Sequence, residues 1–153
     1  MENLRLEVDY RSVSAPNPNG RIIAPHSIVH SGTRWHVRAW CEKNGEFRDF
    51  VLSRFFDVPT IEGKSNKSPK DDESWETKIN VCFVPDHRLD PEQQKVVAND
   101  YGMVNNKLVI NVRASLIPYL LKAMNIDPSI IHADPCAQQI VIENINAVKP
   151  YLF

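Results

Sequence analysis

Three consecutive stretches decide the fold of this chain: TRWHVRAWC at residues 33–41, KNGE at residues 43–46 and FRDFVLSRF at residues 47–55. In the first stretch apolar and polar side chains alternate, which is typical of a β-strand with one face in a core. We expect Trp35 and Val37 to face one way and His36 and Arg38 the other. The Asn-Gly pair in KNGE is a strong hairpin signal, so the third stretch is predicted to return as the next strand.

The residues before this hairpin have the same character. Apolar and charged side chains alternate over residues 4–11, which indicates a half-buried strand. Residues 22–30 form a further apolar run, but Pro25 lacks a backbone donor and predicts an edge or irregular strand. Short strands joined by tight turns over residues 1–61 favour a small β-barrel domain.

Residues 62–74 read EGKSNKSPKDDES and contain no aromatic or β-branched side chain. Such a stretch buries too little apolar surface to order itself, so we predict a flexible linker here. The run Asp71-Asp72-Glu73 within it is expected to be solvated. The predicted domains are therefore residues 1–61 and residues 75–153.

The second domain is predicted to be a small α+β domain with an antiparallel sheet. Strands are expected at 78–84 and 107–113, a helix from Asp90-Pro91 to about Gly102, and a helical stripe over 116–124. Asp134-Pro135 indicates a third helix start, although residues 140–142 could equally form a strand. We predict the order βαββα, a ferredoxin-like arrangement, with a further element possible. The fold class is thus mainly β followed by α+β.

Composition and charge exclude several classes of protein. The chain has 153 residues, a formal net charge of −1, and a hydrophobic fraction of 42%, as a globular protein does. Its three cysteines form no CxxC pair, which suits a reducing cytoplasm, and no apolar run approaches the roughly 20 residues of a membrane span. We therefore expect a cytoplasmic protein. Charge is uneven, because residues 21–55 carry six basic and three acidic side chains.

This basic segment also holds the densest group of side chains that could bind a ligand. They are His26, Ser31, Arg34, His36, Arg38, Arg48, Ser53 and Arg54. The planar fork of arginine grips phosphate oxygens with two hydrogen bonds, and interleaved aromatic side chains could stack on bases. Charged residues that alternate with apolar ones are equally typical of a solvated strand, and that alternative stays open.

No enzyme or cofactor motif occurs in the sequence. There is no Gly-x-Ser-x-Gly elbow, no phosphate loop and no GxGxxG. His26 and His30 are four residues apart, but no carboxylate or cysteine completes a metal-binding set with them. We therefore expect neither catalysis nor a bound metal or cofactor.

The motifs RIIAPH at residues 21–26, GTRWHVRAWC at 32–41 and FRDFVLSRF at 47–55 resemble the WYL domain of bacterial transcriptional regulators. The triplet that names the family falls on WHV at residues 35–37, and its Arg-x-Phe-x-x-x-Arg signature is intact at Arg48, Phe50 and Arg54. This variant resembles the repressors of anti-phage defence operons. Residues 77–127 resemble the C-terminal extension domain that follows WYL, mainly through LVINVR at 108–113 and IPYLL at 117–121.

The resemblance implies an Sm-like or SH3-like barrel that binds single-stranded DNA or a nucleotide in a basic pocket. By position, that pocket would use Ser31, His36, Arg38, Arg48, Ser53 and Arg54. Relatives act as homodimers and contact operator DNA through an N-terminal helix-turn-helix, which we do not expect in this chain. Whether it is a fragment or a stand-alone sensor stays open. The alternative is a protein-interaction or dimerisation module without a nucleotide ligand.

Overall fold

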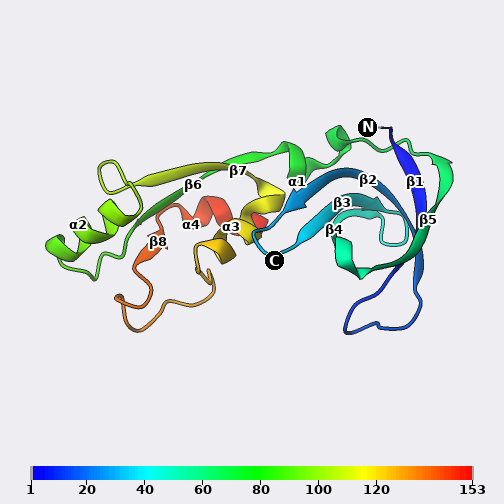
Figure 1. The fold of residues 1–153 in the computed structure, drawn as a ribbon. Coiled ribbons are helices and arrows are strands. Elements are labelled where there is room, and N and C mark those ends of the chain that lie inside the picture. The colour runs from blue at the N-terminus through cyan, green and yellow to red at the C-terminus, as the bar shows by residue number, and fades with distance from the viewer. Residues whose placement is uncertain (1, 153) are drawn as a thin grey trace. The chain divides into compact units, whose positions relative to one another are not determined.

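The computed structural model describes residues 2–152 of the chain and divides it into two compact units, Met1–Glu73 and Ser74–Phe153 (Figure 1). Each unit has its own sheet and its own core of buried side chains. The first is built from strands and the second from strands and helices, so the predicted class, mainly β followed by α+β, is confirmed. No helix among the described residues is long and apolar enough to cross a membrane.

The first unit is one antiparallel sheet with the strand order β4-β3-β2-β1-β5. Its strands are β1 (Leu4–Tyr10), β2 (Gly20–His30), β3 (Trp35–Cys41), β4 (Glu46–Val51) and β5 (Phe55–Lys64). The predicted hairpin joins β3 to β4, where Gly45 takes φ 65° and its amide donates to the carbonyl of Cys41 at 2.8 Å. This left-handed conformation is the one that glycine adopts without steric cost.

The core of the first unit lies on one face of this sheet. Val37 and Phe50 are cross-strand neighbours within it, and Val8, Ile23, Ala39 and Cys41 complete the buried cluster. Trp35 stands at the start of β3 and is 53% exposed, so it does not belong to that core. Full burial of a valine, isoleucine or phenylalanine side chain contributes about 1.5–3 kcal/mol, so the buried cluster on this face stabilises the unit.

Strand β2 is irregular, as predicted, but it is not an edge strand. It pairs with β1 through Ile23 and with β3 through residues on both sides of Pro25. The register shifts between Pro25 and Ser27, so His26 occupies a bulge. A bulge is one of the few places where a sheet tolerates a residue without an amide hydrogen.

The second unit has a sheet of order β7-β6-β8. Its strands are β6 (Lys78–Pro85), β7 (Leu108–Arg113) and β8 (Ile140–Ile142), and its longer helices are α2 (Pro91–Asp100) and α3 (Ile117–Ala123). Its short helix is α4 (Ile145–Val148), and its 3-10 turns are η3 (Ala114–Leu116) and η4 (Lys149–Tyr151). The short helix α1 (Glu73–Glu76) begins at the last residue of the first unit. Asp90 caps α2 in a capping box with Gln93, as its position before Pro91 predicts.

Two predictions for this unit need correction. The third strand follows α3 instead of preceding it, so from β6 onward the order is βαβαβα and not βαββα. Asp134-Pro135 begins a turn and no helix, and residues 140–142 form β8, which pairs with β6 at Phe83 and Ile142. Backbone pairing of residues 140–142 with β6 decides between strand and helix, and it leaves Ile140 2% exposed.

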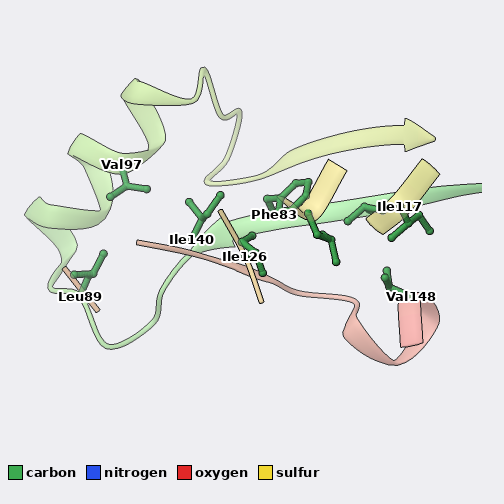
Figure 2. Close-up of a cluster of buried hydrophobic side chains, with 9 residues drawn as sticks. Phe83, Leu89, Val97, Ile117, Ile126, Ile140 and Val148 are labelled. Carbon is green, nitrogen blue, oxygen red and sulfur yellow. The ribbon is translucent and has the colours of Figure 1, made fainter. Parts of the chain in front are cut away.

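A single cluster of apolar side chains holds the second unit together (Figure 2). Phe83 of β6 lies at its centre and is fully buried. Val97 comes from α2 and Ile117 from α3, and both helices turn these side chains toward the sheet. The remaining members are Val81, Leu89, Leu121, Ile126, Ile140 and Val148.

The segment 62–74 is more ordered than its composition predicts. Strand β5 continues to Lys64, which pairs with Leu4 of β1. A 3-10 turn, η2 (Pro69–Asp71), follows, and Asp72 directly after it is 1% exposed. The prediction of a solvated charge run is therefore wrong for Asp72, and the reason lies in its partners on β2 and β3.

Candidate functional site

Strand β3 is buried on both faces. His36 and Arg38 point away from the apolar core, as predicted, and yet they are only 5% and 9% exposed. Their cross-strand neighbours on β4 are Val51 and Asp49. A buried guanidinium requires compensating acceptors, because taking a charge out of water is costly.

Arg38 finds those acceptors in two carboxylates. Its Nε donates to Asp72 Oδ2 at 2.7 Å and its Nη2 donates to Asp72 Oδ1 at 2.9 Å, which is the two-pronged arginine–carboxylate geometry. Its Nη1 donates to Asp49 Oδ1 at 3.3 Å. Burial by itself lowers the pKa of Arg38, but the hydrogen bonds and charges of Asp72 and Asp49 raise it above its ordinary value.

His26 completes this arrangement from the bulge in β2. Its Nε2 lies 3.0 Å from Asp72 Oδ2, and its Nδ1 lies 2.8 Å from the hydroxyl of Ser27. The side chains of His26 and Asp72 are each 2% exposed. We call His26, Arg38, Asp49 and Asp72 the Asp72 cluster.

The turn before Asp72 is locally defined. Ser68 donates its amide to Asp71 Oδ2 at 2.8 Å, and a capping box closes η2. Lys67 Nζ lies 4.3 Å above the ring of Trp40, a cation–π contact with the same face of β3. The segment 67–72 is therefore fastened to β3 at both ends.

A second group of side chains lies at the start of β3. His36 Nε2 is 3.0 Å from Ser31 Oγ, and Ser31 closes the β2–β3 turn by donating its amide to Arg34 O at 2.9 Å. Arg54 comes from the 3-10 turn η1 (Leu52–Arg54), between β4 and β5. We call Ser31, Arg34, His36 and Arg54 the His36 cluster.

The surroundings of His36 lower its pKa. Burial is the main cause that lowers the pKa of His36. The negative charge of Asp49 raises this pKa, and the positive charges of Arg34, Arg54 and His30 lower it. Arg34 is exposed and Arg54 half-buried, and neither guanidinium makes an ion pair with any residue from 2 to 152. Arg34 and Arg54 therefore contribute positive charge that no ion pair among the described residues neutralises.

The structure does not bring all the predicted site residues together. Arg48 lies on the opposite face of the sheet from Arg38, because it is paired with Ala39 in the register, and its Nε donates to Glu46 at 2.7 Å. Ser53 is exposed in the middle of η1. The grouping of Arg38, Arg48 and Arg54 around one ligand is therefore not the observed arrangement.

Asp72 was missed in the sequence reasoning. It is 46 residues from His26 and 34 from Arg38, so no local pattern links them. The only local signal is Ser68 three residues before Asp71, a capping arrangement that fixes the turn but not its partner. Within residues 2–152, no group of three or more histidine, cysteine, aspartate or glutamate side chains is placed to hold a metal ion.

Comparisons with known proteins agree with the division into two units. Residues 1–59 match the model of the WYL domain family. Residues 78–148 match the model described as "BrxR transcriptional regulator, C-terminal dimerization domain". Residues 1–59 therefore form a WYL domain. The resemblance found in residues 21–55 is thereby confirmed.

Two curated relatives are described as "DNA-binding transcriptional repressor CapW". The one from Stenotrophomonas maltophilia is 34% identical over 99% of this chain, and the one from Escherichia coli (strain KTE188) is 36% identical over 99%. This chain spans about half the length of each, 50% in both cases. A solved structure of the proteasome accessory factor B/C (PafBC) of Arthrobacter aurescens is 16% identical to this chain. The alignment covers 98% of this chain and 23% of the PafBC chain, with a TM-score of 0.33.

The two matched regions leave residues 60–77 between them. The WYL match includes every member of the His36 cluster and also His26, Arg38 and Asp49. Asp72 lies outside both matches, although it is the main partner of Arg38 in this chain.

Proposed function

We propose that the WYL unit binds an anionic ligand derived from nucleic acid, either single-stranded DNA or a nucleotide, at the His36 cluster. The observation that carries this proposal is the pair of uncompensated guanidiniums, Arg34 and Arg54, beside the buried His36. A phosphate there would accept charge-assisted hydrogen bonds without breaking an existing ion pair.

In this proposal the second unit contributes self-association. Its match to a dimerization domain and the CapW relatives support a role as the sensing and dimerising part of a transcriptional repressor. Operator binding is not proposed for the residues of this chain.

Fluorescence anisotropy of a labelled single-stranded DNA octamer tests the ligand-binding role. We expect saturable binding that weakens steeply with salt, because phosphate contacts release counterions. Arg34→Ala and Arg54→Ala should each weaken it about ten- to hundredfold, which corresponds to one charged hydrogen-bonding contact. Arg5→Ala is the matched control, since Arg5 is an arginine of the same unit that is already paired with Glu42.

Competition by unlabelled mononucleotides and dinucleotides would distinguish a nucleotide ligand from single-stranded DNA. Equal binding by wild type, Arg34→Ala and Arg54→Ala would contradict the proposed site. Sedimentation equilibrium of the same chain at low and high salt tests self-association. An apolar dimer interface should survive high salt, whereas the binding of DNA should not.

A protein-interaction module is the second candidate. Edge strand β5 exposes Phe56, Val58 and Ile61, with 45%, 89% and 64% of their surfaces accessible. Exposed apolar side chains on an edge strand are a feature of surfaces that pair with another chain. Saturable DNA binding lost in Arg54→Ala would favour the first candidate over this one.

A further inference from the structure

We infer that Arg38 and His26 form an anion site that the chain itself fills with the carboxylate of Asp72, and that a ligand phosphate competes with Asp72 for it. This inference rests on the proposed function and extends it to the regulation of the same pocket. Neither family match includes Asp72.

The contacts of Asp72 are those that a bound phosphate would make. Arg38 presents two donors to its two oxygens at 2.7 and 2.9 Å, and His26 adds a third contact at 3.0 Å. Arginine forks bind carboxylates and phosphates with the same two-pronged geometry. Asp72 is 1% exposed, so its carboxylate is shielded from solvent while it makes these contacts.

Charge compensation favours replacement of the Asp72 carboxylate by a phosphate over the binding of both at Arg38. Arg38 already has a second carboxylate, Asp49, and adding a phosphate beside both would bring three anionic groups to one guanidinium. Release of Asp72 without a replacement would leave Arg38 buried with the single 3.3 Å contact to Asp49. A phosphate that enters as Asp72 leaves avoids both costs, because it replaces the lost acceptors.

The site also lies within reach of a ligand held at the His36 cluster. His36 and Arg38 are two residues apart on the same face of β3, roughly 7 Å along the strand. A ligand with two phosphate groups could place one at Arg34 and Arg54 and the second at Arg38. A ligand with a single phosphate would have to choose between the two positions.

Displacement of Asp72 has a consequence for the connection between the two units. Asp72 precedes Ser74, the first residue of the second unit, by only two positions. While it is bound, the segment 67–72 is attached to β3 through Lys67 on Trp40 and through Asp72 on Arg38. Once Asp72 is replaced, one of those attachments is lost, so ligand binding would favour states with a freer connection.

The test compares Asp72→Asn with Asp49→Asn in the full chain. Both remove one negative charge next to Arg38, but only Asp72→Asn weakens the internal occupant. The probes are a fluorescein-labelled single-stranded DNA octamer and pyrophosphate, the latter measured by calorimetry. We expect the affinity of Asp72→Asn for the octamer to be at least about tenfold higher than that of wild type. It should also be higher than the affinity of Asp49→Asn.

Hydrogen exchange of the wild-type chain gives a second readout that does not depend on whether Asp72→Asn folds. Addition of the octamer should speed amide exchange at residues 69–73 while it slows exchange at residues 31–38. Slower exchange at 69–73, or a folded Asp72→Asn that binds no more tightly than wild type, would overturn the inference and leave the proposed function standing. Binding of neither probe to wild type or Asp72→Asn would overturn both.

Discussion

The rings of Tyr10 on β1 and Phe50 on β4 lie edge to face with their centroids 4.9 Å apart, although β2 and β3 separate the two strands in the sheet. In a flat sheet the three intervening spacings would place the strands about 14 Å apart. The sheet must therefore curl strongly. The Tyr10 hydroxyl also accepts a hydrogen bond from the amide of Val51 at 3.0 Å, which fixes β4 against β1. This curvature fits the predicted barrel, whose Sm-like identity stays a prediction.

Phe50→Ala should lower the free energy of unfolding by about 3–5 kcal/mol, because it leaves a cavity in the core and removes the ring contact with Tyr10. Phe56→Ala is the control, since that ring is 45% exposed, and it should cost far less. Urea denaturation followed by circular dichroism measures both. Similar losses in the two variants would contradict the central role assigned to Phe50.

Arg38→Met should destabilise the chain by about 3–5 kcal/mol, since it leaves the carboxylate of Asp72 buried without its main partner. The double variant Arg38→Met, Asp72→Leu should regain much of this loss, because no buried charge is left between the two positions. Arg48→Met serves as the matched control, because its exposed pair with Glu46 should contribute less than about 1 kcal/mol. Additive losses in the double variant would show that the two residues are not coupled.

Arg48 and Arg54 share one sequence signature, but Arg48 is paired with Glu46 and Arg54 makes no ion pair with a described residue, so their variants should differ. Arg54→Ala should reduce the affinity for single-stranded DNA about ten- to hundredfold. Arg48→Ala should change it less than about threefold at physiological salt, because Arg48 lies on the face of the sheet opposite to His36 and is already paired with Glu46. Anisotropy titrations of both variants measure the difference. Equal losses would mean that the ligand also contacts the face of β4 that carries Arg48.

Stability should depend on pH through His36. Burial and neighbouring positive charges lower its pKa in the folded chain below the ordinary value of 6.5, so the unfolded chain binds more protons as pH falls through that value. The free energy of unfolding should therefore decline as pH falls below 6.5, down to the lowered pKa.

His36→Gln should flatten this decline by up to about 1.4 kcal/mol per pH unit, the limit for one proton. Denaturation curves between pH 7.5 and pH 5 measure the slope. His87→Gln is the control, because the side chain of His87 is 91% exposed. An unchanged slope in His36→Gln would show that another group is responsible.

Local patterns in the sequence determined a good part of this structure. Alternation over residues 33–41 and Asn-Gly at 44–45 predicted the β3–β4 hairpin, and Asp90-Pro91 predicted the start of α2. These signals act through neighbouring residues, since strand alternation, turn conformation and helix capping are satisfied within a few positions. The basic segment and the WYL motifs likewise identified the part of the chain that holds the candidate site.

Only the tertiary structure decided which charged side chains meet. Arg38 and Arg48 look equivalent in the sequence, but the register places them on opposite faces of the sheet. Asp72 looks like part of a solvated run, yet the path of the chain after β5 brings it onto His26 and Arg38. Contacts over 34 and 46 residues depend on how the sheet curls and where β5 ends, and no local periodicity encodes either. The buried guanidinium of Arg38 needs a compensating carboxylate, and the tertiary structure supplies Asp72, which the sequence alone did not reveal.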